Sequence, residues 1–378
     1  MLVVLVLLLA LVGYDLYQFQ DMSSTMASSH ALDGAPTSTD GGTNILLMGL
    51  DTRKDQNGQQ LPQTILDQLH AGDGNEGGYN TNTLILMHIP ANGGKVQAFS
   101  IPRDDAVNVP GYGLHKIKEA YGNAKATAET AAHKQGVSDQ HQLETIGREA
   151  GRKLETQTVR DLTGVPIDHI AEISLAGFYD LANALGGIQV CLNHAVDDSA
   201  YSGAVFPAGV QTLNGAQALA FVRQRHGLPN GDLDRTHRQQ AFLSSASHNI
   251  RSPATLLNPF TTTTLMDAAK RDIVIDQGWS AFSMATQLQN LTGGNTVFQT
   301  LPITGFYTVN GESANRIDPK QIRQIIQSTF DGSNNGAAAA ASNTITVNLA
   351  SVSGPGAPTQ APPNGAPVQS DTGTPCVN

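Results

Sequence analysis

Three strand-like runs rich in apolar residues constrain the fold of this chain more than any other feature. They read NILLMGL (44–50), TLILMHIP (83–90) and VQAFSIP (96–102), and the turn ANGGK joins the last two. Such runs are typical of buried strands, because a strand with one exposed face would alternate apolar and polar residues. Helical patterns alternate with further strand-like runs along the chain. The sequence therefore predicts one α/β domain with helices on both faces of a sheet.

The ordered domain is expected to cover residues 44–330. Helices are predicted near 117–133, 141–162, 175–185, 214–222, 234–252, 278–291 and 318–330, and strands near 167–174, 188–192, 297–303 and 306–309. The polar stretch between the first two apolar runs contains one amphipathic piece, PQTILDQLH, and otherwise indicates a surface insertion.

The N-terminal twenty residues predict a membrane anchor. Fourteen residues, mostly apolar, precede the first charge at Asp15. This is fewer than the roughly 20 that span a bilayer, and the run lacks the basic start and nearby cleavage site of a signal peptide. We interpret residues 1–20 as the outer part of a single transmembrane anchor that is shortened by a start assigned too late, and residues 21–43 as a linker.

The C-terminal end is compositionally distinct. Residues 331–378 are rich in Ala, Gly, Ser and Pro and predict a low-complexity tail, interrupted by a strand-like TITVNL. The chain has two cysteines, Cys191 in a strand-like run and Cys376 near the end of the tail. In an extracytoplasmic domain they could form a disulfide. We hypothesise that they bond and hold the tail against the domain, with two free thiols as the alternative.

The charge pattern points to a small anion. The formal net charge is −10, yet the stretch RQRHGLPNGDLDRTHRQQ (223–240) holds four of the thirteen arginines. An acidic chain argues against nucleic acid as the main partner, because duplex binding requires a broad basic surface. A local arginine cluster instead suits a buried anion such as a phosphate.

Two strand-end motifs supply further charged residues. GLDTR places Asp51 and Arg53 after the first apolar run, and SIPRDD places Arg103 and Asp104 after the third. Ligand sites in open α/β sheets form at the ends of strands. Lys116, in HKIKEAYG, opens a predicted helix and could reach an anion. The alternative is that these side chains cap turns or are solvated.

The arginine cluster can form one wall of such a site. If AFVRQR is extended as it leaves its helix, Arg223 and Arg225 share a face. Asp234 is a suitable N-cap for the next helix, whose residues Arg235, Arg238, Gln239 and Phe242 recur at helical spacing. The alternative is a surface network of ion pairs. The neighbouring His226 and His237 fit no metal-binding pattern, and no nucleotide, zinc or serine-hydrolase motif occurs.

Taken in order, these motifs resemble the LytR-CpsA-Psr family of cell-wall glycopolymer ligases. The motifs in this order are GLDTR, NTNTLILMHIP, FSIPRDD, HKIKEAYG, LANALGGIQVCL, LNGAQALAFVRQRH and GDLDRTHRQQ. The resemblance implies a three-layer α/β/α domain with a central mixed sheet, held outside the cytoplasm by a single-pass membrane anchor. It implies transfer of a glycan from a polyprenyl pyrophosphate carrier, as a glycosyl phosphate, to a peptidoglycan hydroxyl, with Mg²⁺ bound.

The resemblance also assigns roles to individual residues. Pyrophosphate contacts fall on Arg53, Arg103, Lys116, Arg223, Arg225, Arg235 and Gln239, and catalytic roles fall on Asp51, Arg103 and Asp104. Asp51 matches a magnesium-binding aspartate, and either Asp51 or Asp104 could accept the proton of the hydroxyl. A non-catalytic binder of lipid-linked intermediates remains an alternative, and a transcription regulator is disfavoured by the anchor and the acidic charge.

One departure from the family concerns the metal. At NTN (80–82) the family more often has an arginine, a small residue and a second metal-binding aspartate, whereas this chain has Asn80 and Asn82. An amide oxygen can bind Mg²⁺ but supplies no charge. The sequence therefore predicts a metal site at Asp51 and Asn82 that is weaker than the family's, with substrate phosphates as possible compensation.

Overall fold

A central mixed sheet organises the chain. The computed structural model describes residues 26–74, 78–229, 231–251, 258–279, 283, 296–330, 344–346 and 376–378. Across the sheet lie β1 (Ala27–Ser29), β12 (Ile273–Asp276), β7 (His169–Ser174), β2 (Thr43–Leu50), β3 (Thr81–Ile89), β4 (Val96–Ser100), β13 (Thr296–Thr300) and β16 (Thr344–Thr346). β2 pairs in parallel with β7, as β4 does with β13, whereas β2, β3 and β4 form antiparallel pairs. The three apolar runs are thus confirmed as neighbouring central strands.

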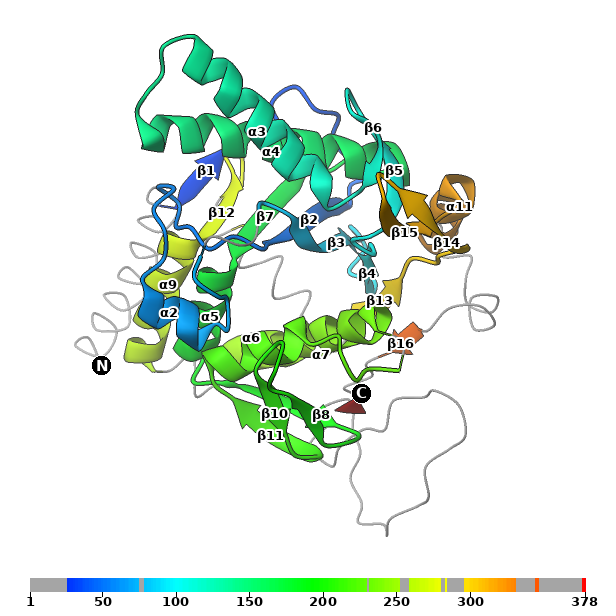
Figure 1. The fold of residues 1–378 in the computed structure, drawn as a ribbon. Coiled ribbons are helices and arrows are strands. Elements are labelled where there is room, and N and C mark those ends of the chain that lie inside the picture. The colour runs from blue at the N-terminus through cyan, green and yellow to red at the C-terminus, as the bar shows by residue number, and fades with distance from the viewer. Residues whose placement is uncertain are drawn as a thin grey trace, which may run out of the picture.

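The central strands are mostly apolar, and both faces of the sheet are covered by helices. Leu46 and Met48 of β2 pack on one face, among residues of α3 (Glu119–Lys134), α4 (Gln140–Thr163) and α11 (Pro319–Phe330). Ile45 and Leu47 belong to the core on the opposite face. The helices that cover this opposite face are α5 (Leu175–Ala184), α6 (Gly215–Arg223), α7 (Asp232–Arg251) and α9 (Pro259–Asp272) (Figure 1). The predicted α/β architecture with helices on both faces is confirmed.

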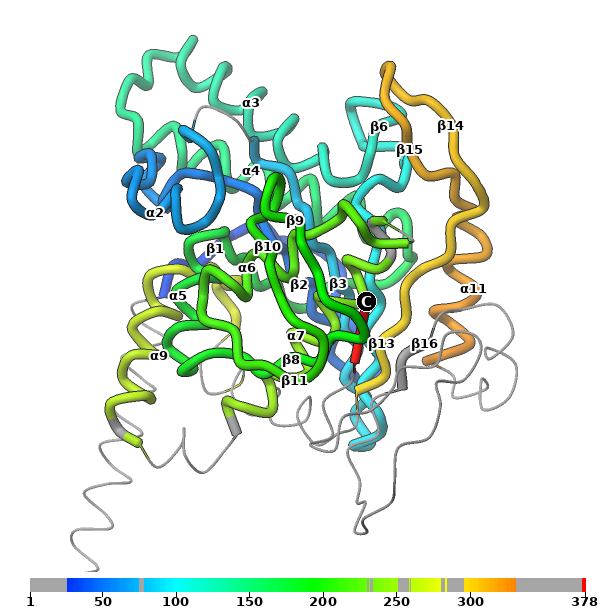
Figure 2. The backbone as a smooth tube through the Cα atoms, turned by 60° about the horizontal axis from the view of Figure 1, so that its bottom comes forward, coloured from blue at the N-terminus to red at the C-terminus, as the bar shows by residue number. Residues whose placement is uncertain are grey.

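Short elements surround these layers. The segment between β2 and β3 carries α2 (Gln63–Gln68), and two hairpins are β5–β6 (Ala106–Val109, Gly113–Lys116) and β14–β15 (Gly305–Val309, Glu312–Arg316). Next to α6 and α7 lie the pair β9–β10 (Val196–Asp198, Ala204–Phe206) and a small sheet of β8 (Ile188–Leu192), β11 (Gly209–Leu213) and β17 (Cys376–Val377) (Figure 2). The predicted helix at 278–291 falls almost wholly outside the described residues, and α9 was not predicted.

The predicted linker at 21–43 is wrong where the structure describes it. Residues 27–29 form the edge strand β1, parallel to β12. The Ser38 backbone N–H and hydroxyl both donate to Asp168, at 2.7 Å and 2.5 Å. The domain therefore begins before residue 44. The predicted anchor at 1–20 lies outside the described residues, and among those that are described no helix is long and apolar enough to cross a membrane.

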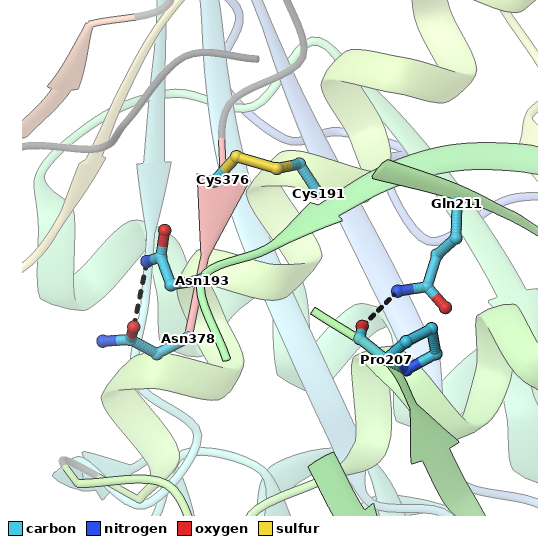
Figure 3. The surroundings of a disulfide bond; sticks show 6 residues. All are labelled: Cys191, Asn193, Pro207, Gln211, Cys376 and Asn378. Atoms are coloured by element: carbon cyan, nitrogen blue, oxygen red, sulfur yellow. Dashed lines mark hydrogen bonds between the residues drawn. A yellow bond between two sulfur atoms is a disulfide. The ribbon is translucent and has the colours of Figure 1, made fainter. Parts of the chain in front are cut away.

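The end of the chain returns to the domain through a disulfide. Cys191 of β8 and Cys376 of β17 are bonded, which confirms the hypothesised pair (Figure 3). Cys376 pairs with Cys191 in a parallel register, and Asn193 donates a hydrogen bond to the Asn378 side chain at 2.9 Å. The strand-like TITVNL is also confirmed at 344–346, where β16 pairs with β13. The predicted tail thus contributes two short strands.

Candidate active site

Asp51 and Asn82 lie side by side at the edge of the sheet where β2 and β4 end and β3 begins. The Asp51 carboxylate accepts hydrogen bonds from Arg53 Nη1 at 2.6 Å and from the Asn82 amide at 2.8 Å, one on each oxygen. The Asn82 carbonyl in turn accepts from Arg103 Nη1 at 2.6 Å. The Asp51 backbone N–H donates to the Asn80 carbonyl, which holds the two strand ends together. The predicted strand-end motifs therefore meet in one hydrogen-bonded row.

Backbone carbonyls of the insertion between β2 and β3 orient two of the arginines. Arg223, the last residue of α6, donates from Nη1 to the Leu69 carbonyl at 2.6 Å, and Arg53 donates from Nε to the Ala71 carbonyl at 3.3 Å. Burial lowers the pKa of the Arg223 guanidinium, with the Asp51 carboxylate opposing this shift and the Arg53 charge adding to it. The insertion therefore holds cationic groups within electrostatic reach of Asp51.

Three further predicted residues face the same space. Arg225 follows α6, Arg235 and Gln239 lie on α7, and all three line one cavity together with Asp51 and Arg103. The Arg225 side chain is exposed, and it has no hydrogen bond or ion pair with any residue that the structure describes. Guanidinium groups that converge on one opening suit a bound anion with several oxygen atoms.

The cavity has an apolar interior. It encloses about 870 Å³ between the sheet and the helices α5, α6, α7 and α9. Away from the arginines its lining includes Ile85 and Met87 of β3, Phe178 of α5, Phe242 of α7, Met266 of α9 and Trp279. This volume lies in the range of ligand-binding pockets. One cavity therefore joins a cationic end to an apolar end.

Asp104 and Lys116, which were predicted to line the site, are not among the residues that line the cavity. Asp104 accepts a hydrogen bond from Lys118 Nζ at 2.6 Å and lies 3.6 Å from Arg103 Nε. Lys116 is buried and pairs with Glu312. Burial alone would raise the pKa of Asp104, but the hydrogen bond from Lys118 and the charges of Arg103, Lys118 and Lys116 outweigh it and hold the pKa below its ordinary value. Asp104 is thus an ion-paired carboxylate beside the site.

Arg238, predicted on the same helical stripe as Arg235 and Gln239, does not reach the cavity. Its side chain is fully buried and donates to the Asn378 carbonyl and, at 2.5 Å, to the Gln224 side chain. Burial lowers the pKa of Arg238 to about 10. Arg238 therefore fixes the returning end of the chain against α7 instead of serving the cavity.

Arg53 is also absent from the cavity lining, because its guanidinium is turned onto Asp51 and the insertion. Sequence reasoning did not find Lys118, nor the Leu69 and Ala71 carbonyls that orient the arginines. Lys118 lies in the quoted motif HKIKEAYG and could have been considered, whereas backbone carbonyls carry no sequence signal.

The donor set for a metal is small. Asp51 supplies a carboxylate and Asn82 an amide oxygen, and among the described residues no group of three or more His, Cys, Asp or Glu side chains could hold a metal ion. Magnesium commonly binds through one or two carboxylates and completes its shell with water and substrate phosphates. These residues therefore fit Mg²⁺ only with oxygens supplied by a bound phosphate.

Known proteins are similar to this chain in sequence and in fold. LcpA of Corynebacterium glutamicum, named a cell wall biosynthesis protein, is 46% identical over 290 residues, which are 76% of this chain and 55% of that protein. The transferase TagU of Oceanobacillus iheyensis, named for joining teichoic acid from a polyisoprenyl carrier to peptidoglycan, is 28% identical over 73% of each chain. The chain thus spans about half the length of LcpA.

A solved structure of TagT bound to LI-WTA superimposes with a TM-score of 0.52 at 20% identity, covering 81% of this chain and 95% of that one, and it shares the fold. The sequence model of the LytR_cpsA_psr family matches residues 15–331. Together with the similarity to LcpA, this match over most of the chain shows that the protein belongs to the LytR-CpsA-Psr family.

Proposed function

We propose that this protein is a phosphotransferase that moves a glycopolymer from a polyprenyl pyrophosphate carrier to a hydroxyl of peptidoglycan, forming a phosphodiester. One observation carries the proposal, namely that a single cavity of about 870 Å³ joins an arginine-lined end to an apolar interior. A polyprenyl pyrophosphate has the same two-part chemistry. Membership of the family and the name of the relative TagU support the choice of substrates.

The arginines bind the pyrophosphate in this proposal. Arg103, Arg223, Arg225 and Arg235 line the cavity and present fixed positive charge to the phosphate oxygens, and Gln239 adds an amide donor. Negative charge grows on the leaving phosphate during transfer. Cationic groups that are already in position stabilise this charge without reorganising, which lowers the barrier.

The transfer itself is a displacement at phosphorus. The acceptor hydroxyl oxygen forms a bond to the phosphorus that carries the glycan, and the bond from that phosphorus to the bridging oxygen breaks. Polyprenyl monophosphate leaves with the electron pair. We assign the hydroxyl proton to Asp51, because Asp51 lines the cavity whereas Asp104 does not.

Magnesium is part of the proposal. Asp51 and Asn82 would hold the ion together with pyrophosphate oxygens, and when bound it would supply further positive charge to the substrate. Arg103 donates a hydrogen bond to the Asn82 amide oxygen, so this arginine lies directly beside the proposed metal ligands. Arg53 holds the carboxylate of Asp51 from the other side.

We further propose that the domain works outside the cytoplasm, tethered by residues 1–20 to the cell membrane. The disulfide between Cys191 and Cys376 supports this location, because disulfides persist in oxidising compartments. The lipid carrier and the peptidoglycan acceptor are both found at that surface of the membrane.

A transfer assay tests the proposal. The full chain in detergent is incubated with a radiolabelled lipid-linked glycan, peptidoglycan fragments and Mg²⁺, and label on the fragments is measured. We expect transfer by the wild type. For Arg225→Ala we expect the affinity for the lipid-linked glycan, measured by calorimetric titration, to fall about tenfold to a hundredfold, the scale of one charge-assisted contact. The matched control is Arg316→Ala, which removes an exposed arginine of β15 that does not line the cavity.

Asn82 favours a second candidate, a binder that holds the lipid-linked intermediate without transferring it. The amide supplies no charge where the family more often has an aspartate, and its two polar atoms already pair with Asp51 and Arg103. Lipid binding without transfer, under conditions in which a known relative transfers, would select this candidate. Unchanged lipid binding in both Arg223→Ala and Arg225→Ala would contradict both.

A further inference from the structure

An exposed pair of stacked rings stands at the cationic end of the cavity. Tyr201, in the turn between β9 and β10, stacks on His226 with ring centroids 3.7 Å apart and an interplanar angle of 23°. Both residues line the cavity. Tyr201 remains 65% exposed although His226 covers one face of its ring, so the other face is open to solvent.

Asp198 contacts both the turn that carries Tyr201 and the ring of His226. Its backbone carbonyl accepts the N–H groups of Tyr201, Ser202 and Gly203, each at 3.1 Å, and its buried carboxylate accepts the Ser202 hydroxyl at 2.5 Å. The second carboxylate oxygen lies 3.8 Å from His226 Nδ1. Asp198 therefore fixes the turn that carries Tyr201, and the stacking on His226 positions the two rings against each other.

The β9–β10 turn packs against the same insertion between β2 and β3 that orients Arg223. A Cβ atom built on Gly203 would lie 2.4 Å from the His70 ring, so the β9–β10 turn packs closely on the insertion beside α2 (Figure 2). The carbonyl of Leu69, the residue before His70, accepts the hydrogen bond from Arg223. His226 directly follows Arg225, whose side chain has no partner among the described residues. The ring pair is therefore adjacent to the end where the pyrophosphate is proposed to bind.

We propose that the open face of Tyr201 is a binding subsite for the pyranose ring of the sugar joined directly to the pyrophosphate. A pyranose presents a face of C–H groups, and the negative face of an aromatic ring attracts such groups while shielding them from water. The sugar extends from the pyrophosphate on the side opposite the lipid tail, whose proposed place is the apolar interior. This inference rests on the proposed function and adds to it the residue that recognises the first sugar.

The test compares ligands that differ only in the sugar. The full chain in detergent is titrated calorimetrically, at fixed Mg²⁺, with farnesyl pyrophosphate and with farnesyl pyrophosphoryl glucose and farnesyl pyrophosphoryl N-acetylglucosamine. We expect the wild type to bind at least one sugar-bearing probe roughly threefold to tenfold more tightly than the sugar-free probe, the scale of one ring stack. Tyr201→Ala should lose this gain and keep its affinity for farnesyl pyrophosphate, and Tyr201→Phe should retain both.

Phe306→Ala is the matched control, because Phe306 is an exposed aromatic residue of β14 that does not line the cavity. It should behave as the wild type. The inference is overturned if the wild type gains nothing from the sugar, if Tyr201→Ala keeps the gain, or if Tyr201→Ala weakens both kinds of probe equally. Failure of the wild type to bind any of the three probes would instead overturn the proposed function, and the subsite with it.

Discussion

At the scale of single residues, the two aspartates at the strand ends differ in their surroundings. Asp51 lines the cavity, and each of its carboxylate oxygens accepts one hydrogen bond. Asp104 lies outside the cavity lining among Arg103, Lys116 and Lys118, and these charges hold its pKa low. A carboxylate with a depressed pKa is a weak base at neutral pH. Sequence reasoning could name both aspartates but had no means of distinguishing them, because their partners come from distant segments.

Substitution of each aspartate by asparagine should separate these roles. Asp51→Asn should lower the transfer rate by about 10²-fold to 10⁴-fold or more, because it removes both the proposed general base and the carboxylate that would hold Mg²⁺. Asp104→Asn should lower the rate by less than about tenfold and lower the melting temperature, because it leaves Lys118 without its partner. Rates from the transfer assay and thermal unfolding curves measure both effects. The reverse pattern of rate losses would assign the base to Asp104.

Asn82→Asp should strengthen the response to Mg²⁺. A second carboxylate beside Asp51 repels it in the absence of metal, since the hydrogen bond from the Asn82 amide to Asp51 is lost. We expect Mg²⁺ to raise the melting temperature of Asn82→Asp and to bind it roughly tenfold more tightly, about 1.4 kcal/mol, than the wild type. Calorimetry with and without farnesyl pyrophosphate measures the affinity. Equal Mg²⁺ affinity in the two proteins would show that residue 82 does not contact the ion.

At the scale of elements, α7 illustrates what helical periodicity can and cannot predict. At about 100° per residue, Gln239 and Phe242 lie within about 40° and 20° of Arg235 around the helix, but Arg238 lies about 60° away, on the side opposite Gln239. Arg235, Gln239 and Phe242 line the cavity, whereas Arg238 donates hydrogen bonds to Gln224 and Asn378. Helical periodicity therefore predicted that these residues lie on one side of α7. Whether Arg238 at the border of that side reaches the cavity depended on its contacts with Gln224 and Asn378.

Edge strands show the same limit. Residues 27–29 are Ala and Ser, which give no strand signal, and they form β1 only because β12 offers a free edge. The pairing of β17 with β8 likewise depends on a disulfide between distant cysteines. Long apolar strands were predictable from local pattern, whereas these short strands depend on distant contacts.

A buried glutamate in the layer of α3 and α4 should make the stability of the fold depend on pH. Glu155 of α4 is fully buried and accepts the Tyr121 backbone N–H at 3.0 Å, and burial raises the pKa of Glu155 to about 8. Between the ordinary pKa of a glutamate and about pH 8, the Glu155 carboxyl group therefore keeps its proton in the folded state but loses it in the unfolded state. The stability of the folded state that depends on the protonated Glu155 side chain is fully present below the pKa of the unfolded state, and it is lost as the pH rises towards about 8.

Glu155→Gln, which cannot titrate, should therefore gain stability relative to the wild type as the pH rises from about 5 to about 8, by a few kcal/mol. Urea unfolding of both proteins at the two pH values gives the difference in free energy of unfolding. The same difference at both values would mean that Glu155 titrates normally in the folded protein.

The disulfide should stabilise the element pair β8–β17. Cys376→Ser should lower the free energy of unfolding by about 2–5 kcal/mol, because the bond closes a loop across a sequence separation of 185 residues. It should also free the end of the chain that Arg238 holds. Chemical denaturation measures the loss, and a reductant should reproduce it in the wild type while leaving the variant unchanged. Equal stability of the two proteins would show that the pairing of β17 is independent of the bond.

At the scale of the whole molecule, the fold separates its charges by layer. The arginines of the cavity stand on the α6–α7 side of the sheet, whereas the α3–α4 side buries Arg148 and Arg152 against Glu172 of β7. The sequence predicted the α/β class and the central strands, and it named the polar residues that line one end of the cavity, because strand ends and the arginine cluster are local features. The family resemblance implied an apolar cleft, but no local pattern predicted its wall, which combines α5, α6, α7, α9 and the sheet.

The central claim is that one cavity binds both the pyrophosphate and the lipid tail. The most direct test is calorimetric titration of the full chain with farnesyl pyrophosphate, inorganic pyrophosphate and farnesol under identical conditions. We expect farnesyl pyrophosphate to bind much more tightly than either fragment, because it alone reaches both the arginines and the apolar interior. Binding of either fragment as tight as that of the whole ligand would contradict it.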